Sequence, residues 1–140
     1  MHKVFFVLFT LAILVGCNYS NSRSNLPGDN KSAVGCCSKF DDLRKAGKTD
    51  EALQMMSEEV SREDMIGVFN KVDSILGKLV SYETGDVTSN MNTNNGMESD
   101  DFEVNFKCVY EKGKAKEQFV LHAGSSHLIQ ITGFHVTWDL

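Results

Sequence analysis

The sequence predicts an α+β domain in which N-terminal helices pack on a curved, four-stranded antiparallel sheet. Two features predict this class. Apolar residues recur at every third or fourth position before Gly77, which is a helical period, and at every second position after it, which is a strand period. Because the helices precede the strands instead of alternating with them, we expect them to gather on one face of the sheet.

The first residues are not expected to belong to this domain. His2 and Lys3 give a short basic start, and residues 4–15 are apolar except for Thr10. A helix of that length spans about 18 Å, whereas the apolar core of a bilayer is about 30 Å thick. The pattern is typical of a secretory signal peptide over residues 1–16. A buried core helix is the alternative, and it is disfavoured because apolar side chains occupy every face.

The end of this segment, Leu14-Val15-Gly16-Cys17, resembles the lipobox of bacterial lipoproteins. The resemblance implies cleavage between Gly16 and Cys17, a diacylglycerol attached to the Cys17 thiol, and acylation of the new amino terminus. Two or more acyl chains make a lasting anchor, so we expect the bilayer to be a partner, reached through acylated Cys17. An ordinary secreted protein cut nearby is the alternative.

The expected location is therefore the cell envelope. The residue after the lipidated cysteine, Asn18, favours by analogy the outer membrane, facing the periplasm, if the cell is Gram-negative. The sequence leaves Gram-negative and Gram-positive sources open. The chain carries a formal net charge of −5 and has no apparent basic cluster, so we expect no nucleic-acid partner.

Residues 17–35 are expected to form a flexible tether. This stretch is rich in Ser, Asn and Gly, contains the only proline of the chain, Pro27, and offers little apolar surface to bury. The folded part then begins near Cys36, and residues 36–140 are expected to form a single domain.

Two short helices are predicted before the clearest one. Phe40, Leu43 and Ala46 recur at steps of three, and Gly47 ends that helix. A second helix restarts near Thr49, where the following acidic residues suit the positive end of the first turn.

The clearest helix covers residues 61–76. Ser61 and Asp64 resemble a capping box at its start, with Asp in place of the usual Glu, and Gly77 suits the position just after its end. The apolar residues recur at steps of three and four: Met65, Val68, Phe69, Val72, Ile75 and Leu76. We expect this stripe to be the main contact between the helices and the sheet.

Four strands are expected after Gly77. The first carries Val80 and Tyr82 on one face, and the polar stretch 88–101 is predicted to be a loop or a long hairpin tip. The second strand alternates strictly, with one face formed by Phe102, Val104, Phe106, Cys108 and Tyr110. A hairpin turn around Gly113 leads to the third strand.

The third and fourth strands complete the sheet. Phe119 and Leu121 lie on the buried face of the third strand. In the fourth, Ile129 and Ile131 are out of phase with the apolar residues that follow: Phe134, Val136 and Trp138. A one-residue slip accounts for both sets, so we predict a β-bulge at Gly133.

This order of elements resembles the cystatin-like cone fold, which includes the nuclear transport factor 2-like superfamily. The resemblance is carried by "KAGKTDEALQMMSEEVSREDMIGVFNKVDSILGKLVSYE", which contains a glycine turn, two helices and the start of a strand. It covers roughly residues 40–136 and implies a curved sheet wrapped around a long helix. Enzymes of that superfamily hold an acid, a tyrosine or a histidine at the mouth of the cone.

The possible pocket residues are Tyr82 and Tyr110, which lie on apolar faces of their strands, where the hydroxyl group usually reaches the edge of the core. His122 and His135 are out of phase with their apolar neighbours, so we expect both to face solvent. No acid is expected on the inner face of a strand, and no acid–base pair can be assembled. We therefore predict no catalytic residue, no cofactor and no metal site; the Asp- and Asn-rich stretch 86–101 lacks the ligand spacing of an EF-hand.

The preferred function is that of a non-catalytic envelope lipoprotein that binds a protein, a peptide or a small apolar ligand through its cone or its sheet face. The alternative is a small hydrolase or isomerase of the nuclear transport factor 2-like superfamily. The two differ in one structural feature, an open pocket on the concave face. The enzyme requires it, and it is absent if this face is filled by Phe102, Phe106, Phe119 and Ile131.

Three cysteines are left after Cys17. Cys108 is in phase with its buried neighbours, and Cys36 is in phase with Phe40, so a Cys36–Cys108 disulfide is the first choice and Cys37–Cys108 the second. A free Cys108 that is merely a small buried residue is the alternative.

Overall fold

The computed structural model describes residues 20–24, 27–125 and 128–139. The expected signal peptide, its cleavage site at Gly16 and the expected lipidation site at Cys17 lie outside these residues. The elements, in chain order, are β1 (Ser20–Ser24), α1 (Pro27–Lys45), α2 (Thr49–Leu53), α3 (Arg62–Leu76), β2 (Leu79–Asn94), β3 (Met97–Tyr110), β4 (Gly113–Ala123) and β5 (Ile129–Thr137). No helix among the described residues is long and apolar enough to cross a bilayer.

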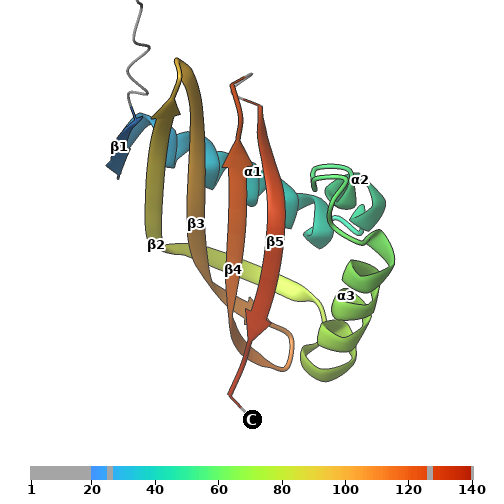
Figure 1. The fold of residues 1–140 in the computed structure, drawn as a ribbon. Coiled ribbons are helices and arrows are strands. Elements are labelled where there is room, and N and C mark those ends of the chain that lie inside the picture. Colours follow the sequence, from blue (N-terminus) through green and yellow to red (C-terminus); the bar gives the residue numbers. More distant parts are fainter. Residues whose placement is uncertain (1–19, 25–26, 126–127, 140) are drawn as a thin grey trace, which may run out of the picture.

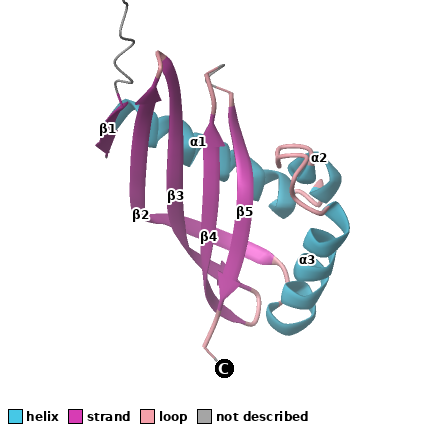
Figure 2. Cartoon of the chain, viewed as in Figure 1, coloured by secondary structure: helices cyan, strands magenta, loops and turns pink. Residues whose placement is uncertain are grey.

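The strands form one antiparallel sheet in the order β1-β2-β3-β4-β5, with helices packed against it (Figures 1 and 2). The predicted α+β class is confirmed, and the predicted four-strand meander corresponds to β2 through β5. The additional edge strand, β1, pairs with the second half of β2, from Ser20 opposite Asn94 to Ser24 opposite Asn90. It lies within the stretch that we expected to be a tether.

The long helix that faces the sheet is α1, which begins at Pro27, well before the expected start near Cys36. Proline suits the first turn of a helix because its missing N–H has no partner there. Figure 1 shows α1 running across one face of the sheet, with α3 at one end of it. The expectation that α3 makes the main contact with the sheet is therefore wrong. Ala33, Cys37 and Phe40 of α1 are completely buried.

The ends of α3 follow the sequence signals. The Ser61 side chain accepts a hydrogen bond from the Asp64 N–H at 3.3 Å, which confirms the N-terminal cap. Gly77 ends the helix with φ +76°. A Cβ at this position would lie 2.5 Å from the Glu111 Oε2 atom, so the close approach of the β3–β4 turn also requires glycine.

Of the two alternatives for residues 88–101, the hairpin is found and the loop is not, because β2 and β3 continue through this stretch as paired strands. Only Asn95 and Gly96 form the turn, with φ of 52° and 77°. Two residues of positive φ make the turn whose twist matches that of the flanking strands, and Asn-Gly is its preferred sequence.

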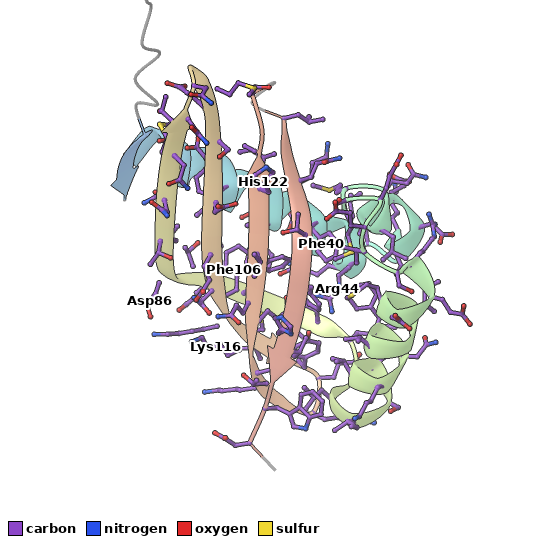
Figure 3. The ribbon with its side chains drawn as sticks, viewed as in Figure 1. Phe40, Arg44, Asp86, Phe106, Lys116 and His122 are labelled. Carbon is purple, nitrogen blue, oxygen red and sulfur yellow. The ribbon has the colours of Figure 1, made fainter. Side chains whose placement is uncertain are left out.

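The sheet is strongly bent. Figure 1 shows the first half of β2 crossing the other strands and its second half running alongside β3. The bend coincides with a shift of register between Thr84 and Val87, and Asp86 lies there (Figure 3). A Cβ on Gly85 would come within 3.0 Å of the Asn105 carbonyl oxygen. The predicted bulge in β5 is confirmed, because Val120 pairs with Gly133 and the next residue, Leu121, pairs with Ile131.

Candidate functional site

The concave face of the sheet is filled by side chains. Phe102, Phe106, Phe119 and Ile131 are at most 3 % exposed. The Phe119 ring packs edge-on against Phe40 of α1, with ring centroids 5.5 Å apart, and lies 5.0 Å from the Phe134 ring. The open concave pocket that the enzyme alternative requires is therefore not found at these positions.

A cluster of charged side chains lies inside this apolar core. The Arg44 guanidinium donates hydrogen bonds to Asp41 at 2.8 Å, to Glu117 at 2.9 Å and to the Tyr110 hydroxyl at 3.2 Å. The Tyr110 hydroxyl in turn donates to Glu117. Both carboxyl side chains are 0 % exposed, and the Arg44 side chain is 6 % exposed. We refer to Asp41, Arg44, Tyr110 and Glu117 as the buried ionic cluster.

Two neighbouring aromatic rings of the core lie against Arg44. The centre of its guanidinium lies 4.6 Å from the Phe69 ring centroid and 5.2 Å from that of Phe134. Figure 3 shows Arg44 between the sheet and α3. A buried cation over ring faces is attracted by their electron density, so the arginine links α1, α3 and the sheet.

The cluster contains two acidic side chains and one basic one, so its formal charges balance when one of the acids holds a proton. Burial raises the pKa of Asp41 well above its ordinary value, and the neighbouring Glu117 charge raises it further, although Arg44 opposes both effects. Asp41 therefore keeps its proton at neutral pH. Burial alone would lower the pKa of Arg44, but the Glu117 and Asp41 carboxyl groups outweigh it and raise that pKa. The result is one carboxylate, one carboxylic acid and one guanidinium, with no net charge.

The expectation that no acid lies on the inner face of a strand is wrong. Glu117 points inward beside Phe119 and Leu121 on β4. The alternation of β4 itself contains this signal, because residue 117 is two positions before residue 119. We missed it because an acid at an inward position is costly without a partner, and Arg44 lies far away in the sequence.

A ligand in solution cannot reach the two carboxyl groups of the cluster. A hollow of about 230 Å³ between α1, α3 and β2 is lined by Arg44 and Phe69, but neither Asp41 nor Glu117 is part of its lining. Donor atoms of Asp41, Glu117 and Cys108 lie within 4.8 Å of one another. Since Arg44 already binds an oxygen of each carboxyl group, its positive charge opposes a metal cation there, and we assign the three residues no metal.

The expected pocket residues do not meet. Tyr110 belongs to the buried ionic cluster, whereas Tyr82 stacks on Phe106 and donates a hydrogen bond to Asp42 at 2.9 Å. Burial, followed by this hydrogen bond, raises the pKa of Tyr82 to about 12. His122 and His135 are exposed, as predicted.

Cys37, not Cys36, lies on the face of α1 that meets the sheet. Cys37 and Cys108 are buried, Cys36 is partly buried, and all three are free thiols, so neither expected pairing is formed in the structure. Burial raises the pKa of Cys37 and of Cys108, and nearby acidic groups add to the effect. A protonated, buried thiol is a poor nucleophile, so these cysteines are part of the core.

A larger hollow, of about 610 Å³, lies on the face of the sheet that the helices leave open. Its lining includes Lys107 from β3, Lys114 and Lys116 from β4, Glu83 from β2, and Trp138 just after β5. We refer to it as the basic hollow. These lysines form no cluster in the sequence, because they lie on two strands that become neighbours only through the pairing of β3 with β4. Each of these lysines alternates with an inward-facing residue of its own strand, as Lys116 does with Ala115 and Glu117.

A separate hollow of about 310 Å³ lies between α3 and β5. It is lined by Lys71, Val72, Phe134 and His135 among others, and it shares Trp138 with the basic hollow. Small-molecule sites usually occupy about 300–1,000 Å³, so the basic hollow is well within this range and the second hollow is at its lower limit.

No family model matches the chain, and neither a curated protein nor a solved structure matches it. The resemblances to bacterial lipoproteins and to cystatin-like domains therefore stay predictions.

Proposed function

We propose that the protein is an exported, lipid-anchored, non-catalytic binding protein of the cell envelope, and that it takes a small ligand at the basic hollow. One observation supports this site above the others. The concave face is filled by aromatic rings, while the open face carries a hollow of about 610 Å³ with a tryptophan in its wall. A ligand of ordinary size therefore finds room on the outer face and none at the aromatic core.

The fold proposal is a cystatin-like cone. It is supported by the bend of β2 and by the long helix α1 that runs across the curved sheet. The anchor proposal is supported by Leu14-Val15-Gly16-Cys17 directly after a short apolar run. The first strand of the sheet, β1, begins at Ser20, close to Cys17 in the sequence, so a lipid on Cys17 would hold the domain next to the bilayer.

A small hydrolase or isomerase is the second candidate, and the Asp41–Glu117 carboxyl pair is the observation in its favour. Two coupled carboxyl groups, one of them with a raised pKa, are common in acid–base catalysis. Both groups are completely buried, however, and neither lines the adjacent hollow. A substrate cannot reach them in this conformation, so we assign the pair to folding.

The anchor is tested by metabolic labelling with a fatty-acid analogue. Cys17→Ser is expected to lose the label and to accumulate as an uncut precursor, because the thioether forms on the thiol. Equal labelling of the wild type and the variant would exclude Cys17 as the lipidation site.

The binding site is tested by a thermal-shift screen of the full chain against a small-molecule library. A ligand present at about 100 times its Kd stabilises the native state by about 2.7 kcal/mol, which raises the Tm by several degrees. We expect the double variant Lys107→Glu, Lys116→Glu to lose the shifts that the wild type gives. Lys71→Glu, in the neighbouring hollow, is the matched control and should keep them. Shifts that survive in the double variant would contradict the basic hollow as the site.

A further inference from the structure

The lysines of the basic hollow bring together positive charges that no ion pair among the described residues neutralises. Lys107 and Lys116 are direct partners in the register of β3 and β4, and Lys114 is two positions before Lys116, on the same face. Like charges directly opposite one another destabilise a sheet. Within the described part of the chain, none of these three lysines forms an ion pair.

The acids around the hollow do not balance the lysines. Glu83 is opposite Lys107 on the neighbouring strand, and Asp139 lies beyond the end of β5. On the other side, Lys116 pairs with Thr137, whose side chain is uncharged. The lining therefore has three formal positive charges and two negative ones, in a chain whose net charge is −5. The charge at this site is opposite in sign to that of the whole protein.

The wall of the hollow also offers an apolar surface. Trp138 is partly buried and packs against the core, so one side of its indole is fixed. Val109, directly opposite Lys114 on β3, is an exposed hydrophobic residue and adds to this surface. Figure 3 shows Lys116 toward one end of β4, with His122 toward the other, so the site lies at the end of the sheet where β5 leads into Trp138.

We propose that the basic hollow binds a small anion with a flat apolar body, with its carboxylate, sulfonate or phosphate group between Lys107 and Lys116 and its apolar body against Trp138. An anion at this position relieves the repulsion between the two lysines, and charged hydrogen bonds to it are stronger than neutral ones. The volume of the hollow suits a single small molecule. This inference rests on the proposed function, because it names the ligand class of the same site.

Trp138 is the only tryptophan of the chain, so its fluorescence reports on the hollow directly. The protein is purified in the form that the cell produces, and its emission is recorded during titration with 4-phenylbutyrate. The neutral analogue 4-phenylbutyramide has nearly the same shape and serves as the matched ligand. We expect the carboxylate to bind about tenfold more tightly than the amide, since a charge-assisted hydrogen bond contributes more than a neutral one. Added salt should reduce this difference.

Replacement of single lysines tests where the anionic group binds. Lys107→Gln and Lys116→Gln change exposed side chains, and circular dichroism verifies that they fold. Each is expected to weaken binding of the carboxylate by about fivefold, which is the scale of one lost partly exposed ion pair. Lys71→Gln removes the same charge from the neighbouring hollow, which also contains Trp138, and should leave the affinity unchanged.

Three results would overturn the inference. Equal affinity for the amide and the carboxylate would mean that the hollow binds apolar molecules, so that the proposed binding function stands and the ligand class is wrong. An effect of Lys71→Gln as large as that of Lys116→Gln would place the anion elsewhere. No change of Trp138 emission with either compound at millimolar concentration would refute both the ligand class and the basic hollow as the binding site.

Discussion

Replacement of Arg44 by methionine tests the assignment of charge within the buried ionic cluster. Methionine keeps most of the volume of the side chain and removes the guanidinium. The wild-type group makes hydrogen bonds to Asp41, Glu117 and Tyr110 at 2.8, 2.9 and 3.2 Å. Without it, Glu117 is a buried carboxylate with no cation, and a charge left alone in this way costs about 3–5 kcal/mol. We expect Arg44→Met to lower the free energy of unfolding by about this amount.

Asp41→Asn is the informative control. Because Asp41 holds its proton at neutral pH, asparagine resembles it in shape and charge and keeps an oxygen for Arg44. Near pH 4, where the wild type holds this proton in the folded state and largely in the unfolded state, we expect a loss of no more than about 1 kcal/mol, the scale of one neutral hydrogen bond. Near pH 7 we expect a smaller loss or a gain, because asparagine has no proton to retain on folding.

The assay is urea unfolding near pH 7, followed by far-ultraviolet circular dichroism for the wild type and both variants. A loss of less than about 1 kcal/mol in Arg44→Met would show that the cluster is not an ionised pair. A loss in Asp41→Asn as large as that in Arg44→Met would show that Asp41 carries the negative charge, and the proton assignment would then be wrong.

Three further outcomes follow from the same contacts. The pKa of Asp41 is raised, so the native state retains a proton that the unfolded chain releases above about pH 4. The stability that this proton contributes is fully present at lower pH and falls as the pH rises toward the raised pKa. The free energy of unfolding of the wild type, measured from about pH 5 to about pH 9, should therefore fall relative to that of Asp41→Asn, and an equal pH dependence of the two proteins would contradict this. Phe69→Ala should lower the free energy of unfolding by about 3–5 kcal/mol because the ring is buried against Phe40, Phe134 and Arg44; an unchanged Tm would mean that this face of α3 is exposed. Gly77→Ala should cost about 1–3 kcal/mol, from its positive φ and the contact with Glu111; urea unfolding measures it, and a neutral substitution would mean that the β3–β4 turn is free to move away.

The parts of the fold that depend on local sequence were predictable. The Ser61 cap, the glycine stop at position 77 and the bulge at Gly133 each depend on a few neighbouring residues. The Asn95-Gly96 turn is equally local, but its flanking strands are so polar that the pattern left a loop and a hairpin tip open. The presence of helix in residues 27–35 was not predictable in the same way, because the buried residues Ala33 and Cys37 gain their stability from contact with the sheet.

The candidate site was harder to predict because its members come together only in the folded chain. Glu117 and Arg44 are 73 positions apart in the sequence, and each by itself resembles an exposed charge. The same is true of Lys107 and Lys116, which become neighbours through the pairing of β3 with β4. A charge at an inward position predicts that a partner exists, but only the fold identifies the partner.

The central claim is that the interior cluster holds the fold together while the outer hollow binds the ligand. Two-dimensional ¹H–¹⁵N spectra of the full chain, recorded during titration with 4-phenylbutyrate, test it most directly. We expect shifts confined to the surroundings of Lys107, Lys116 and Trp138, with the amides of Asp41 and Glu117 unchanged. Shifts that centre on Asp41 and Glu117, with the lysines unaffected, would contradict the claim and would place the ligand at the buried carboxyl pair.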